Sequence, residues 1–223
     1  MRGLVFVLLG GCVVAGGLCN GCGNPAAGGP PNGESGGRPF RASPQLAEYA
    51  QQIARAARPG ARCRQFVSQF VGTPLEQVAA VYRAVDANWR YVPDPVDDVD
   101  WLQSAEDTLG PLVWRGDCED EAVLMMALLQ AMPDPIDCRL IVAGPTNSGK
   151  SGHAFAEVRI SADRHKDPKL LTRLAKRWGA LGLDYRVDDA CVWLPLQHGC
   201  PPRIYEGADR FAIYPDGKIL KFE

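Results

Sequence analysis

The sequence predicts an α+β fold in which helices come first and an antiparallel sheet follows. Apolar residues recur at helical spacing through residues 43–89, and an unbroken apolar block covers residues 122–129. Residues 138–143, 153–160 and 191–196 are short apolar or alternating runs, which are typical of strands. Because helical and strand-like segments are largely segregated along the chain, the pattern disfavours the alternating βαβ order of a parallel sheet.

Composition indicates one folded domain behind an N-terminal leader. The chain has 223 residues, 46% of them apolar, which is enough for the core of one ordinary domain. We expect a signal peptide at residues 1–22, a Gly/Pro-rich disordered tether at 23–42 and the folded domain at 43–223. The net charge of −2 gives no broad attraction to nucleic acid or anionic lipid, so no nucleic-acid partner is expected.

The leader predicts export to the periplasm or the cell surface of a bacterium. Arg2 precedes an apolar stretch that starts at residues 4–9 and is too short and glycine-rich for a permanent membrane span. Cysteines after small residues are lipidated in bacterial lipoproteins, and the candidates here are Cys12, Cys19 and Cys22. A lipid anchor in the membrane and plain secretion both stay open, as does the alternative of a misassigned start codon.

Three helices are predicted at the start of the domain. Ser43-Pro44 combines a capping hydroxyl with proline in the first turn. A second helix is expected over residues 61–71, with Val71 on its apolar side. Thr73-Pro74-Leu75-Glu76 is a capping box that opens a third helix, whose apolar positions continue as far as Trp89.

An extended and acidic connection follows the third helix. Residues 91–95 contain two prolines, which bias the chain away from helix. The acidic residues suggest a calcium site, but their spacing matches no EF-hand loop, so a solvated acidic loop is the preferred interpretation. They are Asp94, Asp97, Asp98 and Asp100. A short helix is predicted over residues 104–109.

The candidate nucleophile is Cys118, in the run Arg115-Gly116-Asp117-Cys118-Glu119-Asp120-Glu121. This run leads directly into the apolar block at 122–129, which predicts that the cysteine lies in the first turn of a buried helix. Unpaired backbone N–H groups at a helix start carry partial positive charge, which favours a thiolate. The neighbouring carboxylates act in the opposite direction, because negative charge raises the pKa of a thiol.

The candidate base is His153, which begins a run that alternates like a strand. A thiol at a helix start and an imidazole on a strand are the two halves of a nucleophile–base pair. A helix over residues 168–181, a strand over 191–196 and a hairpin that turns at Asp216-Gly217 complete the predicted elements.

Residues 144–151 match the phosphate-binding pattern G-x-x-x-x-G-K-[ST] at every fixed position, but the pattern lies in the wrong context. A phosphate-binding loop needs a helix directly after its lysine, so that the helix N-terminus points at the phosphates. Here Gly152 and the strand-like run from His153 follow Lys150 and Ser151. We therefore expect a polar hairpin loop from Gly144 to Ser151, and we predict neither a bound nucleotide nor any other cofactor.

Four segments together resemble the transglutaminase-like superfamily of papain-related domains, over about residues 75–200. They are residues 101–109, Gly116-Asp117-Cys118-Glu119-Asp120, residues 152–158 and Val192-Trp193-Leu194-Pro195-Leu196. The resemblance implies a papain-like core, with N-terminal helices and a nucleophile helix packed on an antiparallel sheet. It also implies Cys118 as nucleophile, His153 as base and a third residue after the Trp-x-Pro-Leu run, usually an aspartate.

Gln197 occupies that third position and departs from the family pattern. A glutamine carbonyl accepts the hydrogen bond that orients an imidazole but adds no charge, and the papain group works with a neutral amide. Asp188 and Asp189 are less suited, because they precede the strand and should lie at its far end.

Other side chains near these motifs have open roles. The backbone N–H of Cys118 is the first candidate for holding an oxyanion, and the indoles of Trp101 and Trp114 are weaker ones. No second Cys or His lies at ligand spacing around residues 118 or 153, so no metal is expected. Four other cysteines either form two disulfides after export or, for the first two, pack as buried thiols. They are Cys63, Cys138, Cys191 and Cys200.

The predicted function is acyl transfer at the carboxamide or peptide bonds of a protein or peptide substrate, through a thioester on Cys118. Water as the acceptor makes the protein a protease or amidase, and an amine makes it a transamidase; the sequence leaves that choice open. The helix expected at 168–181 lies between the His153 and Gln197 strands, where it would shape or cover the cleft. The alternative function is a binding module that keeps the fold without turnover, and the Gln197 substitution supports it.

Overall fold

The computed structural model describes residues 42–94, 102–110, 113–144, 152–160, 186–188, 191–197 and 210–222. The chain divides into two compact units, residues 1–36 and 37–223, and every described residue lies in the second. Residues 1–41 of the expected leader and tether lie outside the described residues. The same holds for the predicted helix at 168–181 and for residues 145–151 of the phosphate-like loop.

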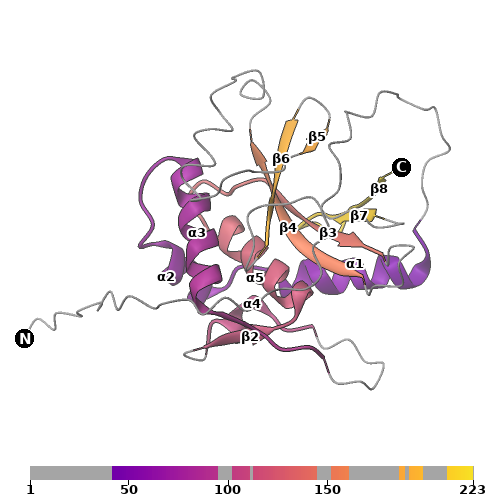
Figure 1. Cartoon of the computed structure of the whole chain (residues 1–223), viewed down its shortest axis with the longest axis horizontal. Coiled ribbons are helices and arrows are strands. Elements are labelled where there is room, and N and C mark those ends of the chain that lie inside the picture. The colour runs from indigo at the N-terminus through magenta and orange to yellow at the C-terminus, as the bar shows by residue number, and fades with distance from the viewer. Residues whose placement is uncertain are drawn as a thin grey trace, which may run out of the picture. The chain divides into compact units, whose positions relative to one another are not determined.

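Helices come first and strands dominate the second half of the chain (Figure 1). The helices are α1 (Pro44–Ala56), α2 (Ala61–Val67), α3 (Pro74–Asn88), α4 (Ala105–Thr108) and α5 (Cys118–Gln130). The strands are β1 (Trp89–Tyr91), β2 (Trp114–Gly116), β3 (Cys138–Ala143), β4 (His153–Ile160), β5 (Arg186–Asp188), β6 (Cys191–Leu196), β7 (Arg210–Ile213) and β8 (Ile219–Phe222). The predicted α+β class is therefore confirmed.

The helices begin where the sequence places their caps. The Ser43 hydroxyl accepts the backbone N–H of Leu46 at 3.2 Å, and Thr73 and Glu76 form both halves of the capping box of α3. Helix α2 starts after Gly60, which has no side chain to cap it. The carboxylate of Glu106, on α4, supplies the missing cap, since it accepts the backbone N–H of Arg62 at 3.1 Å and of Cys63 at 2.9 Å. This contact binds two helices that are distant in sequence.

Two details of the helical prediction are wrong. Helix α2 ends at Val67 rather than at residue 71, and Val71 is 86% exposed instead of lying on an apolar side. The chain must turn into α3, and Gly72 makes that turn with a φ of +124°. Trp89 is not helical either, because it is the first residue of β1 and pairs with Trp114 of β2 in a parallel two-stranded sheet. The sequence analysis missed this small sheet.

The main sheet has six strands in the order β5-β6-β4-β3-β7-β8, and every neighbouring pair is antiparallel. The predicted strands at 138–143, 153–160 and 191–196 are confirmed. The hairpin between β7 and β8 turns where predicted, with Gly217 at a φ of +82°. Strand β5 was not predicted; it pairs with the first half of β6, from Arg186↔Trp193 to Asp188↔Cys191.

Helix α5 packs on one face of this sheet and lies at the centre of the apolar core (Figure 1). All ten residues from Asp120 to Leu129 are buried. The sheet contributes alternate residues such as Leu140, Ala156 and Leu194, and α2 and α3 also pack on α5. A helix that is apolar on nearly all sides is stable only when it is enclosed in this way. The helix that starts at Cys118 is therefore held by the core on several sides.

A buried ion pair lies on the opposite face of the sheet. Arg139 and Glu157 are directly paired across β3 and β4, and both side chains are 0% exposed. The Nε of Arg139 donates to Oε2 of Glu157 at 2.9 Å, and Nη1 donates to the Tyr214 hydroxyl at 3.2 Å. The guanidinium also lies 3.7 Å from the ring centre of Trp193 and 5.0 Å from that of Phe222. This charge is thus paired and stacked where water does not reach it.

The thiols of Cys63 and Cys138 are free and buried. Both side chains belong to the apolar core, which is the second of the two interpretations that the sequence left open. The side chains of Cys191 and Cys200 lie outside the described residues.

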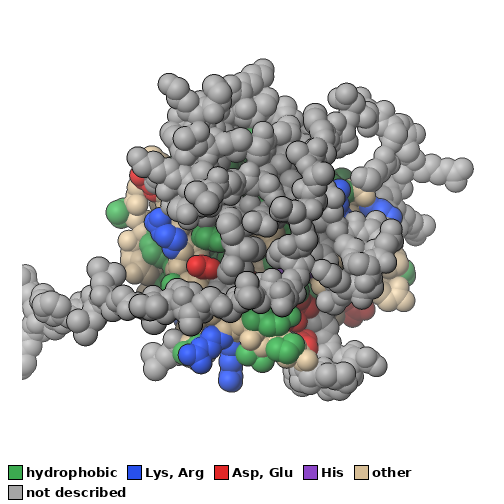
Figure 2. Space-filling view, in the orientation of Figure 1, with side chains coloured by type: hydrophobic (Ala, Val, Ile, Leu, Met, Phe, Trp, Pro, Cys, Tyr) green, Lys and Arg blue, Asp and Glu red, His purple; other side chains and the backbone are tan. Residues whose placement is uncertain are grey.

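The visible surface of the described residues mixes charge types. Lys and Arg side chains form small separate groups among acidic and apolar ones on the face shown in Figure 2. Within the part of the chain that the structure describes, no helix has both the length and the apolar character needed to span a bilayer.

We predict that Glu157→Gln lowers the free energy of unfolding by about 3–5 kcal/mol, because it leaves the buried Arg139 guanidinium without its counter-charge. A second ion pair, Arg159–Asp137, provides a matched control. Its N–O distance of 3.0 Å is close to the 2.9 Å of the buried pair, but its side chains are 44% and 68% exposed. Asp137→Asn should change stability by about 0–1 kcal/mol. Urea denaturation of both variants measures the difference; equal effects would contradict a structural role for the buried pair.

Candidate active site

Cys118 is the first residue of helix α5, as predicted. The preceding residue, Asp117, is the N-cap and has extended backbone angles of −97° and −154°. Its side chain makes no capping hydrogen bond, so the backbone N–H groups of the first turn are not capped by Asp117. The apolar packing of α5 fixes the position of this turn, and the thiol is held with it.

The Gly-Asp-Cys-x-Asp motif has a steric explanation. Asp120 is 1% exposed and folds back over the preceding strand, and a Cβ added to Gly116 would lie 2.3 Å from Oδ2 of Asp120. Oδ1 of the same carboxylate accepts the backbone N–H of Gln103 at 2.7 Å, and Oδ2 accepts the Gln103 amide at 3.3 Å. Glycine at 116 and aspartate at 120 are therefore required together, because they bind the segment before α4 to the first turn of α5.

The Cys118 thiol donates a hydrogen bond to Oε2 of Glu119 at 3.0 Å. Its sulfur also lies against the backbone N–H of Ala154, the residue directly after His153 in β4. Burial raises the pKa of the Cys118 thiol well above its ordinary value, and the negative charges of Glu119 and Asp117 raise it further. The Ala154 N–H acts in the opposite direction because it stabilises the thiolate. The net effect is a raised thiol pKa, with burial as its largest cause and the charge of Glu119 next.

His153 is the first residue of β4, and its ring is held by Gln197. Nε2 of His153 lies 3.2 Å from Oε1 of Gln197, so the longer glutamine side chain does reach the imidazole. The Gln197 backbone is itself fixed, because its carbonyl accepts the Tyr82 hydroxyl of α3 at 3.0 Å. When Nε2 carries the ring proton it donates to Gln197, and Nδ1 keeps the lone pair that a base needs.

Burial lowers the pKa of the His153 imidazole, and the hydrogen bond to Gln197 only partly offsets this effect. A raised thiol pKa and a lowered imidazole pKa both favour the neutral forms. Both the Cys118 thiol and the His153 imidazole are therefore uncharged at rest. An uncharged imidazole is available as a base at neutral pH.

Tyr91 also lies near the thiol, and the sequence analysis assigned it no role. Tyr91 pairs with Gly116 in the parallel β1–β2 sheet, which brings it beside the start of α5, and its side chain is 60% exposed. Burial of part of the ring raises the pKa of the Tyr91 hydroxyl, with further contributions from Cys118, Asp117, Glu119 and Asp94. This proximity results from the pairing of β1 with β2. The spacing of residues in the sequence does not reveal that pairing.

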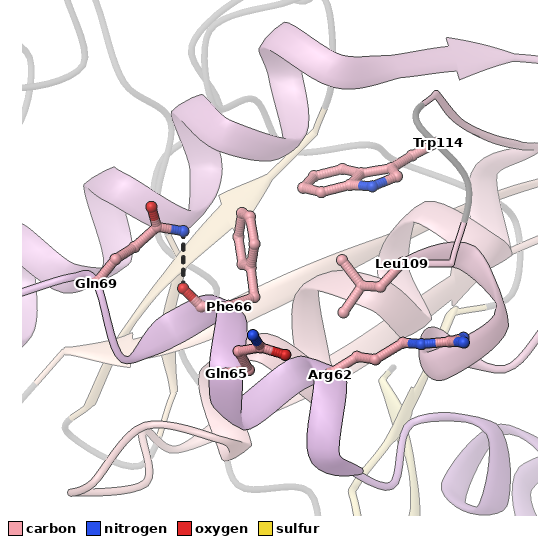
Figure 3. Close-up of a pocket in the computed structure, with 6 residues that line it drawn as sticks. All are labelled: Arg62, Gln65, Phe66, Gln69, Leu109 and Trp114. Atoms are coloured by element: carbon pink, nitrogen blue, oxygen red, sulfur yellow. Dashed lines mark hydrogen bonds between the residues drawn. The ribbon is translucent and has the colours of Figure 1, made fainter. Parts of the chain in front are cut away.

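Trp114, one of the two weaker oxyanion candidates, packs in the core. Trp114 is 7% exposed, and its ring packs edge-on against Phe66 with 5.2 Å between ring centres. Figure 3 shows both rings in a pocket of about 500 Å³ that is lined by Arg62, Gln65, Phe66, Gln69, Leu109 and Trp114. These are the contacts of a core residue. Trp101 lies outside the described residues.

Two alternatives from the sequence can also be located. Asp188 pairs with Cys191 at the start of β6, whereas Gln197 follows the other end of that strand. Asp188 is therefore placed at the far end of β6, as expected.

In the described ranges, no group of three or more His, Cys, Asp or Glu side chains is arranged to hold a metal ion. Gly144 and Gly152 flank the phosphate-like loop, and a strand rather than a helix follows it.

Comparison with known proteins identifies a family. The family model described as the transglutaminase-like superfamily matches residues 49–169, which is more than half of the chain. No curated protein matches the sequence. A crystal structure described as a candidate cysteine protease from Cytophaga hutchinsonii is similar, with 22% identity and a TM-score of 0.33. That similarity covers 48% of this chain and 38% of the other, so this chain spans well under half of that protein's length.

The Asp120 carboxyl predicts a pH dependence of stability. Burial raises its pKa from 3.8 to about 6, so between these values the folded state binds more protons than the unfolded state. Stability from this group therefore falls as the pH rises through that window. We expect the unfolding free energy of the wild type, relative to Asp120→Asn, to fall by up to about 3 kcal/mol from pH 4 to pH 7. Urea denaturation across this range tests the prediction, and a constant difference would contradict it.

Gln197 should set the pKa of His153. Gln197→Glu keeps the side-chain length and places a negative charge near Nε2, so we expect the imidazole pKa to rise by about one unit or more. Gln197→Ala removes the acceptor and should lower the pKa instead. The chain has three histidines, so NMR titration of their ring protons, assigned with His153→Ala, measures the shift. Identical titrations in both variants would show that Gln197 does not act on this ring.

Proposed function

The chain belongs to the transglutaminase-like superfamily, and from that membership we propose that it is a thiol enzyme acting on carboxamide or peptide bonds. Cys118 is the proposed nucleophile, His153 the base and Gln197 the residue that orients the base. The single observation that best supports this assignment is the Nε2–Oε1 contact of 3.2 Å, because with the ring proton on Nε2 it leaves Nδ1 as the basic nitrogen. The next residue in β4, Ala154, donates its backbone N–H to the Cys118 sulfur.

The proposed reaction has two stages. His153 takes the thiol proton on Nδ1 while the Cys118 sulfur forms a bond to the carbonyl carbon of the substrate. The C–N bond then breaks, and the amine leaves with the proton from the imidazolium, which gives a thioester. Water or a second amine attacks the thioester, loses a proton to His153 and displaces the sulfur, which regains a proton as the thiol. The pairing of sulfur and imidazole in the first step stays a prediction.

The start of α5 offers the means to stabilise the oxyanion. The negative oxygen that forms during the attack lies close to the attacking sulfur, and the backbone N–H of Cys118 belongs to the first turn of the helix, where the Asp117 side chain makes no capping hydrogen bond. This assignment needs no tryptophan. Whether water or an amine is the preferred acceptor depends on residues that cover the cleft, and the segment 168–181 expected there lies outside the described residues.

The second candidate function is a binding module without turnover. Two observations favour it: Gln197 supplies no negative charge to the imidazole, and the thiol hydrogen bond is directed to Glu119. Both make an activated thiolate less stable. The two functions differ in whether Cys118 is needed for a covalent change in a substrate.

A library of chemically diverse peptides tests the proposed function. The purified domain should cleave some of the peptides or, when a biotinylated primary amine is present, attach the amine to their carboxamides. Cys118→Ala should abolish both products, and His153→Ala should reduce them by about 10²–10⁴-fold, the usual contribution of a general base. Mass spectrometry detects both changes. No product that depends on Cys118 would support the binding module instead.

We also propose that residues 1–22 export the protein and that a lipid on Cys12, Cys19 or Cys22 anchors it to the membrane. The positively charged start, the short apolar stretch and the Gly/Pro-rich segment that follows support this proposal. Mass spectrometry of the mature N-terminus, in the wild type and in Cys→Ala variants, tests it. A mature chain that keeps residue 1 would contradict export.

A further inference from the structure

A pocket of about 500 Å³ has no role in the proposed reaction (Figure 3). It lies where α2, the end of α4 and the start of β2 meet, and none of its lining residues belongs to the proposed catalytic group of Cys118, His153 and Gln197. A volume of this size is within the range of pockets that hold ligands. The chemistry of its lining therefore indicates what it can bind.

The floor of the pocket is aromatic and apolar. The ring of Phe66 packs edge-on against Trp114, with 5.2 Å between ring centres, and against Phe70, with 5.3 Å. Phe66 and Leu109 pack against the apolar core but are only half-buried. Because part of each side chain is open to the pocket, an apolar group bound there would remove this surface from water.

Two side chains of the lining have hydrogen-bond donors that the protein does not use. Trp114 is only 7% exposed, yet its indole N–H makes no hydrogen bond within the described part of the chain. Its nitrogen lies on the edge of the ring nearest Leu109 (Figure 3). The amide of Gln65 also has no partner among the described residues. Both donors are available to an acceptor on a ligand.

Arg62 is the one charged residue of the lining. Its Nη1 donates to the backbone carbonyl of Glu106 at 2.8 Å, and within the described residues its guanidinium has no carboxylate partner. The Glu106 carboxylate accepts backbone N–H groups at the start of α2, and that of Asp107 accepts the Ser104 hydroxyl at 2.6 Å. The pocket thus offers a cation and neutral donors above an apolar floor, which is complementary to an apolar group that carries a carboxylate.

We propose that this pocket binds a peptide segment in which a large apolar side chain lies next to a carboxylate. The apolar side chain would pack on Phe66 and Trp114, and the carboxylate would pair with Arg62. The inference goes beyond the proposed function, because binding here requires no chemistry at Cys118.

The surroundings of the pocket favour a peptide over a small aromatic acid. Val71, two residues after Gln69, is 86% exposed, and Val113, next to Trp114, is 40% exposed. The apolar surface therefore continues along the chain beyond the lining residues. An extended segment can cover both valines, whereas a small acid would fill the pocket and leave them in water.

Matched tetrapeptides test the site. The parent probe, Ac-Gly-Phe-Glu-Gly-NH2, carries both groups; Gln in place of Glu removes the charge, and Ala in place of Phe removes the ring. The chain has five tryptophans, so NMR of the indole N–H groups, assigned with Trp114→Phe, detects binding at this site. The parent should shift the Trp114 resonance saturably, and either replacement should weaken binding at least about threefold.

Arg62 variants test the charge recognition. Arg62→Gln should weaken binding of the parent at least about threefold and remove the preference for Glu over Gln, whereas Arg62→Lys should keep that preference. Arg64→Gln is the matched control and should bind as the wild type does. Arg64 is exposed on the same helix, and its Nη1 donates to the Pro59 carbonyl at 2.9 Å. Urea denaturation of both glutamine variants controls for the lost hydrogen bond.

Four outcomes would overturn the proposal. Two are an unshifted Trp114 resonance at about 10 mM of the parent peptide and equal weakening by Arg62→Gln and Arg64→Gln. Binding of 3-phenylpropionate as tight as that of the parent would assign the pocket to a small aromatic acid instead. A Trp114 shift on dilution of the protein alone would assign it to a second copy of the chain. None of these measurements depends on turnover at Cys118.

Discussion

The packing of α5 against the sheet determines where the reactive thiol lies. Ten consecutive buried residues hold this helix, and the sheet, α2 and α3 each supply part of the surface that covers it. A shift of the helix along its axis would expose apolar side chains and open cavities, both of which are costly. Cys118 at its first turn therefore inherits its position from the core, while the strand that carries His153 belongs to the same packed unit.

The sequence predicts those parts of the structure that depend on local patterns. The caps at Ser43 and Thr73, the strands of the main sheet and the turn at Gly217 follow from residue preferences at fixed spacing. The steric dependence of Gly116 on Asp120 and the proximity of Tyr91 to the thiol come from contacts across the β1–β2 pair, where segments are only three residues long. Three residues are too few for periodicity to reveal a strand or its partner.

The site residues show the same division. The motif around Cys118 and the run after His153 identify two positions, and the family pattern identifies the third as Gln197. Whether the glutamine reaches the ring depends on the end of β6 and on the Tyr82 hydroxyl, which is distant in sequence. The direction of the thiol proton is a matter of side-chain conformation. A sequence predicts the excess of carboxylates near the sulfur, but not that Glu119 accepts the hydrogen bond of the thiol.

The buried Arg139–Glu157 pair has a consequence for the accuracy of the site. Side chains alternate between the two faces of a sheet, so sliding β4 past β3 by one residue would turn Glu157 toward the apolar face that contacts α5. A slide by two residues would restore the face but separate the carboxylate from the guanidinium. Both misalignments therefore break this ion pair, and both are costly. Since His153 lies four positions before Glu157 on the same strand, and therefore on the same face, the register that this ion pair favours also sets the position of His153 along the strand.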